Sequence, residues 1–470
     1  MSSASDAAFK SDNFIARDIA TWAANLTFGA LSDDAVHIAK LFLFDAIGCA
    51  LGGASQTDVR AALAVAQALG GAPTCTCIVS GFKTDPVQSA FLNSLMIRAM
   101  DYNDIYWKQD PSHPSDIIPA ALSICEMKGL SGRDLLLGII IAYELEMRFC
   151  EAALPGVREY GWHHATLTAF VSPVVAGKML GLDTTKIVRA IGISASRACT
   201  LGCVTAGELT NMKNTVDPMA TRAGVESALL AKQGFTGPAH VIDGKEGLTH
   251  VFGHAWNLDA LTDALPLSQS SHYKIQDCGM KSFPIEALSH APLTAMMKLV
   301  KAHTIQPNDV AEIRVEVIAR AADILGDPSK YRPTSKETAD HSLPYALAVG
   351  LVDGQVTPLQ FREERIGDTA LTPIMDKVKV VPNDEFEALF PEFQPSRVTI
   401  TLRNGDSLEQ RVDVPKGDPR DPMTESEIAE KFHALGDDAL GASRCDELRT
   451  IIMDMENEST LDRFLATTVE

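Results

Sequence analysis

Histidine and aspartate side chains that could transfer a proton gather in one polar stretch, DYNDIYWKQDPSHPSD, at residues 101–116. An imidazole with a pKa near 6.5 can take or deliver a proton at neutral pH, and a neighbouring carboxylate can hold the ring in one tautomer. Pro111 and Pro114 restrict the backbone here. Asp101 and His113 are therefore candidates for acid–base chemistry, although a solvated loop would have a similar composition.

Two further motifs carry titratable groups beside turn residues. YGWHHAT, residues 160–166, places a glycine and aromatic residues before His163 and His164, which serve either proton transfer or packing. TADHSLPYALA, residues 338–348, sets polar residues in an otherwise apolar helical segment, where a capped helix start is the alternative reading. Its polar residues are Asp340, His341, Ser342 and Tyr345.

Two lysines lie in stretches of mixed composition. Lys213 belongs to NMKNTVDPMATRAG, residues 211–224, and Lys281 belongs to GMKSFPIEALSHAP, residues 279–292. Each could be a surface lysine with a buried stem, or a cation that binds an anion. The position of Lys281 near a predicted domain boundary makes the second reading more interesting there.

Helical spacing dominates the first part of the chain, up to about residue 268. Apolar residues recur at helical spacing from Asp33 to Ala50, and Gly52–Gly53 is expected to end that helix. Residues 132–150 are apolar on almost every face, which predicts a central helix. These elements indicate a helical body.

The pattern changes to alternation after about residue 276. Ala311, Ile313, Val315 and Val317 alternate with charged residues, which predicts a half-buried strand. A second alternating stretch, residues 398–414, is interrupted by Asn404–Gly405 and predicts a β-hairpin. Proline and glycine then form a linker before helical spacing resumes. We therefore expect a mostly α protein, with a helical domain made of residues 1–275 and 415–470 and an inserted α+β lid at 276–414, and a ligand site at their seam.

The charge balance argues against two classes of partner. The chain has 470 residues with 41 Lys plus Arg against 61 Asp plus Glu, a formal net charge of −20. Such a charge repels nucleic acid and anionic membrane surfaces. No uninterrupted apolar run reaches the ~20 residues of a membrane span, and the first 14 residues, with Asp6 and Asp12, resemble no targeting segment. We expect a cytoplasmic protein without nucleic-acid or membrane partners.

Signals for cofactors and metals are weak. The glycine patterns of dinucleotide-binding and phosphate-binding loops do not occur. Nine scattered cysteines are typical of reduced, mostly buried thiols. His250 and His254 have metal-binding spacing, but HVFGH lacks the glutamate of a zinc protease motif. The sequence predicts neither a cofactor nor a metal site.

Taken together and in this order, DYND...HPSD, GWHHAT, MKNTVDPMATRAG, KSFP and ADHSLPY resemble the MmgE/PrpD family over nearly the whole chain. The family includes 2-methylcitrate dehydratases, cis-aconitate decarboxylases and iminodisuccinate epimerases. The resemblance implies proton transfer at a carbon next to a carboxylate without metal, a helical domain with a smaller α+β lid, and a homodimer. The positions that match the family's active-site motifs are Asp101, His113, His163, Lys213, Lys281 and Tyr345, with Asp104 as a further acidic position.

The implied chemistry gives these residues roles. Removing a proton next to a carboxylate builds negative charge on its oxygens, which Lys213 and Lys281 could stabilise while they bind the substrate. His113 and His163 would exchange the protons, and Tyr345 would be a second acid. Asp104 is assigned to substrate binding. Because the protein is acidic overall, a tricarboxylate substrate requires a buried basic pocket.

Finer features favour one branch of the family. The spacing from Asp101 to His113 and the KSFPIEALSH stretch resemble 2-methylcitrate dehydratases. Ile105 stands where a threonine is usual, and His164 replaces the proline that normally follows the histidine. The sequence thus predicts a metal-independent hydro-lyase acting on a tricarboxylate. Decarboxylation of cis-aconitate, epimerisation of an amino-dicarboxylate and non-catalytic carboxylate binding are the alternatives.

Overall fold

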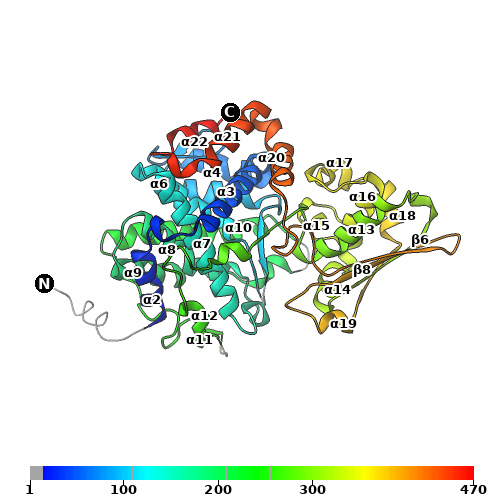
Figure 1. Cartoon of the computed structure of the whole chain (residues 1–470), viewed down its shortest axis with the longest axis horizontal. Helices are drawn as coiled ribbons and strands as arrows, with labels where there is room; N and C mark the ends of the chain where they lie inside the picture. The colour runs from blue at the N-terminus through cyan, green and yellow to red at the C-terminus, as the bar shows by residue number, and fades with distance from the viewer. Residues whose placement is uncertain (1–13, 108–109, 207–208, 253–255) are drawn as a thin grey trace.

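The computed structural model describes residues 14–107, 110–206, 209–252 and 256–470. A large helical body and a smaller lid lie side by side along the longest axis of the molecule (Figure 1). Each has its own buried apolar core. The N-terminal segment with Asp6 and Asp12, and His254, lie outside the described residues. The mostly α fold class with a smaller α+β part is confirmed.

The body combines both ends of the chain. Its last helices pack on α3 and join the same apolar core as the N-terminal ones, and the red C-terminal helices lie against the blue α3 and α4 in Figure 1. The longer body helices are α2 Ile15–Asn25, α3 Asp33–Gly53, α4 Thr57–Leu69, α5 Pro86–Arg98, α6 Ile118–Lys128, α7 Gly132–Ala152, α8 Ala165–Met179, α9 Thr184–Ala195, α10 Met212–Lys232, α20 Glu425–Leu440, α21 Ala442–Met453 and α22 Asp462–Thr467. Two four-residue helices, α11 Leu248–Val251 and α12 Asp259–Thr262, and a two-stranded sheet, β1 Cys75–Thr76 and β2 Lys83–Thr84, complete its peripheral elements.

Helix α3 begins where the sequence predicts and ends at the Gly52–Gly53 pair that was expected to end it. The Ser32 hydroxyl accepts a hydrogen bond from the backbone N–H of Ala35 and caps the helix. At the other end α3 packs so closely on α5 that a Cβ at Gly53 would collide with the carbonyl oxygen of Met96, so this position requires glycine. By length and composition α3 could cross a membrane, but 78% of the relevant window is buried inside the protein, as in a core helix.

The lid is a four-stranded sheet with helices against it. The strand order is β7-β6-β8-β9, with β6 parallel to β7 and antiparallel to β8. The predicted hairpin is confirmed as β8 and β9, and Gly405 in its turn has a φ of +94°. The strands are β6 Val310–Val317, β7 Val378–Pro382, β8 Ser396–Leu402 and β9 Ser407–Val412; the helices are α13 His290–Ala302, α14 Ala319–Leu325, α15 Lys336–Ala339, α16 Leu343–Asp353, α17 Glu363–Ile366, α18 Thr372–Met375 and α19 Asp384–Glu387.

One detail of the predicted strand is wrong. The register of β6 against β8 shifts between Val310 and Glu312, so Val310 turns to the core and Ala311 to solvent. From Ile313 to Val317 the predicted alternation holds. A local bulge is a property of strand pairing, which alternation in a single segment does not reveal.

All nine cysteines are free thiols. Seven are buried, as the sequence predicts, but Cys199 and Cys203 are exposed in the segment that follows α9.

Candidate active site

A small three-stranded sheet brings distant motifs to the seam between body and lid. Its order is β4-β3-β5, with β3 Asp104–Trp107 between β4 Pro111–Ser112 and β5 Gly279–Met280. Asp101 lies shortly before β3, His113 directly after β4, and Lys281 directly after β5. The pairing of β3 with β5 therefore brings the 101–116 loop beside the KSFP motif. Lys281 and Asp101, which are hydrogen-bonded there, are 180 residues apart in the sequence.

Three cations converge on Asp101. Its carboxylate accepts hydrogen bonds from Arg98 and from Lys281 Nζ at 2.7 Å, and lies 3.3 Å from Lys213 Nζ. Burial alone would raise the pKa of Asp101, but the charges of Lys213, Lys281 and Arg98 outweigh it and hold the pKa well below its usual range. Asp101 is thus a buried anion at neutral pH.

Asp340 continues this network from the lid. Its carboxylate lies 3.4 Å from Lys213 Nζ, 3.0 Å from Lys336 Nζ and 2.5 Å from His341 Nδ1. The ADHSLPY motif therefore reaches the site through its aspartate. We call Asp101, Arg98, Lys213, Lys281 and Asp340 the lysine cluster.

Lys281 and Lys213 differ in how many of their ammonium protons remain available to bind a ligand. Lys281 donates to the Asp101 carboxylate and also to the carbonyl oxygens of Asp101 at 3.2 Å and Ile285 at 3.0 Å. An ammonium has three protons, so Lys281 is saturated. Lys213 has two carboxylate neighbours among the described residues, Asp101 and Asp340. One of its protons remains available for a ligand.

His113 is held in a single tautomer by a hydrogen bond to the backbone. Its Nδ1 lies 2.7 Å from the carbonyl oxygen of Asp104, which can only accept, so Nδ1 carries the proton and Nε2 a lone pair. The Asp104 carboxylate in turn accepts from the Ser115 backbone N–H and hydroxyl at 3.0 and 2.5 Å. Burial, with the charges of Arg98 and Lys281, lowers the pKa of His113 well below 6.5. His113 is therefore neutral, and Asp104 positions it from within the fold.

His163 has the opposite tautomer. Its Nδ1 accepts a hydrogen bond from the backbone N–H of Ala165 at 3.2 Å, so the proton resides on Nε2. The backbone N–H of His163 donates to the carbonyl oxygen of Thr200 at 2.8 Å, which fixes the turn before α8. Burial and the nearby His164 and Arg158 lower the pKa of His163 well below 6.5.

His164 connects the two predicted histidines. Its ring centroid lies 4.0 Å from that of His163 and 5.7 Å from that of His113. Its Nε2 faces Asp217 Oδ2 at 3.6 Å, and its Nδ1 lies 3.4 Å from Arg158 Nη2. These five residues, His113, His163, His164, Asp217 and Arg158, form what we call the histidine cluster.

Arg98 joins the two clusters. Besides its bond to Asp101, its Nε lies 3.6 Å from Asp116 and 3.9 Å from Asp217. Burial and the charge of Asp217 raise the pKa of Asp116 well above its usual range. Behind this pair, burial raises the pKa of Glu146 to about 8, and its Oε1 accepts hydrogen bonds from Ser112 and Thr168.

Tyr345 does not join either cluster, and its predicted role as a second acid stays a prediction. Its hydroxyl donates to the carbonyl oxygen of Gln360 at 2.5 Å, and its ring packs against Phe361 in the lid core. Burial raises its pKa. Helix α16 turns this side chain into the lid, while Asp340 and His341, just before the helix, face the seam.

Several residues of the site were missed by sequence reasoning. Asp116 and Asp217 lie inside quoted motifs and were not singled out, and His164 was read as a packing or proton-transfer histidine and a departure from the family but was not assigned to the site. Arg98 ends an ordinary helix and gives no sequence signal. Arg158 lies two residues before Tyr160, the start of the YGWHHAT motif, so its proximity along the chain was the available signal.

Three groups of described residues have ligand atoms close enough to hold a metal ion. In two of them, His163–His164–Asp217 and Asp101–Asp340–His341, an arginine or lysine already lies within 4 Å of an aspartate oxygen. The positive charge of this arginine or lysine would repel a metal ion bound to the same aspartate. The third group, His433–Asp437–Cys445, lies on α20 and α21, outside both clusters.

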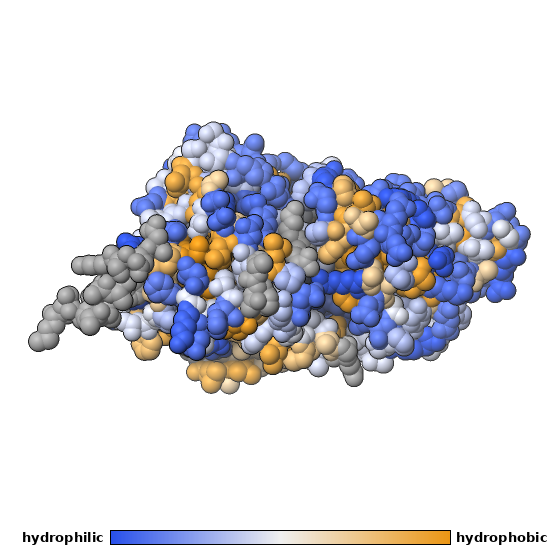
Figure 2. All heavy atoms as spheres, turned by 90° about the horizontal axis from the view of Figure 1, so that it is seen from below, coloured by the Kyte–Doolittle hydropathy of each residue, from blue (hydrophilic) through white to orange (hydrophobic). Residues whose placement is uncertain are grey.

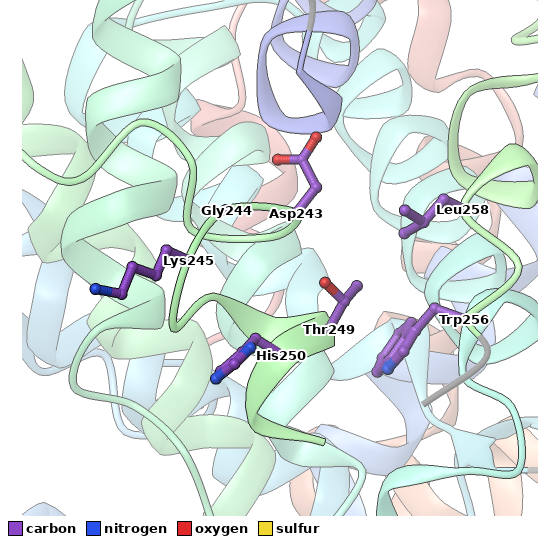
Figure 3. A pocket seen from close by; sticks show the side chains of 7 residues that line it. All are labelled: Asp243, Gly244, Lys245, Thr249, His250, Trp256 and Leu258. Atoms are coloured by element: carbon purple, nitrogen blue, oxygen red, sulfur yellow. The ribbon is translucent and has the colours of Figure 1, made fainter. Parts of the chain in front are cut away.

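Two cavities differ in their relation to the site. One of about 410 Å³ lies at the seam and is lined by Lys281, His290 and Ile105 together with residues 391–394 and 415–420. The other, about 460 Å³, lies on the body; Figure 3 shows Lys245 pointing away from Trp256 and Leu258 around it. The second cavity is lined by none of the predicted site residues. The seam cavity is the one that reaches the lysine cluster.

Family models match both parts of the chain. The MmgE/PrpD N-terminal domain matches residues 17–260, and the MmgE/PrpD C-terminal domain matches residues 283–457. The chain belongs to the MmgE/PrpD family. The family resemblance read from the motifs is confirmed. The C-terminal MmgE/PrpD model covers the lid together with α20 and α21, which pack in the body.

Similar proteins include cis-aconitate decarboxylases and 2-methylcitrate dehydratases. Cis-aconitate decarboxylase of Aspergillus terreus (strain NIH 2624 / FGSC A1156) is 26% identical over 466 residues, covering 94% of this chain and 93% of that protein. The Homo sapiens cis-aconitate decarboxylase is 26% identical over 468 residues, covering 94% and 92%. The 2-methylcitrate dehydratase of Cupriavidus necator is 25% identical over 418 residues, covering 82% of each.

Proposed function

We propose that the protein is an enzyme of the lyase class that acts on a small tricarboxylate by proton transfer next to a carboxylate. The observation that carries this proposal is the pair of buried neutral imidazoles in opposite tautomers, His113 and His163, beside buried cations. The names of the similar proteins support the substrate class, since both act on tricarboxylates or their dehydrated products.

The geometry suggests a division of roles. Nε2 of His113 carries a lone pair and takes the carbon-bound proton, while Nε2 of His163 carries a proton and faces the departing or developing oxygen. A bound polycarboxylate raises the pKa of both imidazoles, because negative charge favours the protonated form. The remaining proton of Lys213 stabilises the carboxylate on which charge develops. Lys281 and Asp101 hold Lys213 and Arg98 in place.

Dehydration of 2-methylcitrate or a close relative such as citrate is our first candidate reaction. Dehydration needs one group to remove a proton and another to assist loss of hydroxyl, which fits two imidazoles of unlike tautomer. The dehydratase-like spacing from Asp101 to His113 points the same way.

Decarboxylation of cis-aconitate is the second candidate. It is favoured by the extent of similarity, since the two decarboxylases quoted above match 94% of the chain and the dehydratase 82%. The same cations and proton donor would serve, with CO₂ leaving and a proton delivered to carbon.

An activity screen separates these reactions. Purified protein is incubated with 2-methylcitrate, citrate and cis-aconitate in chelator-treated buffer, while absorbance follows unsaturated product and a coupled assay follows CO₂. Unsaturated product without CO₂ supports dehydration, and CO₂ from cis-aconitate supports decarboxylation. Loss of activity on chelation would contradict metal independence, and no turnover of any acid would contradict the lyase proposal.

We also propose a cytoplasmic homodimer. Large apolar side chains are exposed on the body, and Figure 2 shows apolar patches on the face seen from below. Light scattering after gel filtration should give twice the mass of 50.5 kDa, and a monomer mass at micromolar concentration would contradict the dimer. Exposed apolar residues of the body include Leu201, Met212, Met219, Phe235, Val251 and Leu267.

A further inference from the structure

Arg158 is a cation of the site whose hydrogen-bonding capacity is largely unused. It lies in a short 3₁₀ helix, Val157–Tyr160, just before the turn that carries His163 and His164. Its Nη2 donates to Nδ1 of His164 at 3.4 Å. Its Nε is buried, and no oxygen of the described residues accepts a hydrogen bond from it. A guanidinium has five N–H donors, so most of this one is open to a ligand.

Two other arginines of the body, Arg148 and Arg98, are buried and paired with carboxylates. Arg148 donates to the Glu144 carboxylate at 2.6 Å and to three carbonyl oxygens of the 260–264 segment. Arg98 has three aspartates within 4 Å. In the part of the chain that is described, no carboxylate lies within 4 Å of the Arg158 guanidinium. Arg158 is half-buried with its Nε fully buried, and a partly desolvated charge without such a partner is costly, which suggests that a ligand completes it.

Asp110 is a carboxylate whose charge acts on Arg158, and one of its oxygens is already used. Asp110 Oδ2 accepts a hydrogen bond from the backbone N–H of Val157 at 2.6 Å, which positions the 3₁₀ helix that carries Arg158. Glu286, on the lid side, is the N-cap of another short helix and accepts from the backbone N–H of Leu288 at 2.7 Å. Both carboxylates therefore shape the surroundings of Arg158 and do not pair with it.

A second guanidinium approaches from the lid. Burial, followed by the positive charge of Arg320 in α14, lowers the pKa of Arg158. The positive charge of Arg320 disfavours the charged form of Arg158, and the negative charge of a bound anion would offset that effect.

We propose that Arg158 binds a carboxylate of the substrate, remote from the carbon whose proton is moved. This inference rests on the proposed function, and it identifies Arg158 as a second position at which the site binds a carboxylate of the substrate. The first is Lys213, in the lysine cluster. Because Lys281 is saturated, two carboxylates of one ligand could be held by Lys213 and Arg158 on either side of the histidines. Such an arrangement selects di- and tricarboxylates over monocarboxylates.

Binding of tricarballylate tests the assignment without requiring turnover. This saturated tricarboxylate has neither the hydroxyl needed for dehydration nor a double bond next to a departing carboxylate. Calorimetry on the full-length wild type and on Arg158→Gln should show a Kd about 10- to 100-fold higher in the variant, the value of a charge-assisted hydrogen bond. Arg197→Gln, which removes an exposed guanidinium paired with Glu226, should bind as the wild type does.

Two further measurements keep the result decisive. Arg158→Lys keeps the charge and loses the planar fork, so its Kd should lie between those of wild type and Arg158→Gln; it also serves if the glutamine variant fails to fold by circular dichroism. Wild-type affinity in both variants would overturn the role of Arg158 and leave the proposed function standing. A wild type that neither binds tricarballylate nor turns over any tested acid would overturn both.

Discussion

The lysine cluster and the histidine cluster are both buried and share Arg98, yet they are completed in opposite ways. Around Asp101 and Asp340 each carboxylate meets two or more cations, and Lys281 uses all three protons. Among the described residues of the histidine side, more of the buried polar atoms lack hydrogen bonds: Asp217 Oδ2, His164 Nε2, Asp116 Oδ2, Glu146 Oε2 and Arg158 Nε. In the lysine cluster Arg98 Nε, which faces the histidine side, lacks one as well. Saturated networks fix a structure, and incomplete ones receive a ligand. The contrast separates the framework of the site from the surface that meets substrate.

The largest expected effect concerns the histidine cluster. His113→Asn and His163→Asn each keep an atom that replaces Nδ1 and lose the reactive Nε2, so turnover should fall about 100- to 10,000-fold with little change in stability. Steady-state kinetics and thermal unfolding measure the two properties. His433→Asn, on the exposed side of α20, is the matched control. Turnover within the range of that control would remove the histidines from the chemistry.

The lysine cluster should respond in stability. Asp101→Asn leaves Arg98, Lys213 and Lys281 without their shared carboxylate, and breaking a buried charge network costs about 3–5 kcal/mol. Asparagine tolerates the φ of +51° found at this position, so backbone strain does not confuse the result. Urea unfolding gives the free energy. Asp376→Asn, which breaks an exposed pair with Arg332, should cost about 1 kcal/mol or less; equal losses in the two variants would contradict the framework role.

The pH dependence of the unfolding free energy tests the protonation state of Glu146, which lies on the histidine side. Its folded pKa of about 8 lies above the usual 4.5, so the folded protein keeps a proton that the unfolded chain releases. Stability from this group is complete below pH 4.5 and is lost as pH rises to about 8, by up to about 5 kcal/mol. Glu146→Gln should therefore lose less stability than wild type over that window. Parallel curves of unfolding free energy against pH would show that Glu146 is ionised throughout.

The smallest effect is expected at Tyr345. Tyr345→Phe removes the hydrogen bond to Gln360 and should cost about 1 kcal/mol of stability, with turnover unchanged. Kinetics and unfolding of the same preparation measure both. A large fall in turnover at preserved stability would return this hydroxyl to the chemistry.

Local sequence patterns were enough to predict helices and strands. The site was harder to predict, because it is built from contacts between residues that lie far apart in the chain. Alternation and Asn404–Gly405 revealed the lid hairpin because both signals act within one segment. Helix α16 is buried on almost every side, so its sequence could not tell which way Tyr345 points. Arg98 ends a helix with no distinctive pattern, and its three aspartates come from other segments. The motifs supplied the candidate residues, and only the fold shows which ones meet.

The shared core of the two chain ends has a consequence for biosynthesis. The lid is one continuous segment whose core residues run from Ile285 to Val412, so it can close as soon as it leaves the ribosome. The body waits for α20 and α21, which pack on α3 and are made last, and for α22, which packs on α21. During synthesis the side of α3 that contacts α20 and α21 therefore stays uncovered while more than 350 further residues are added, and a nascent chain stalled before α20 is the species most in need of a chaperone.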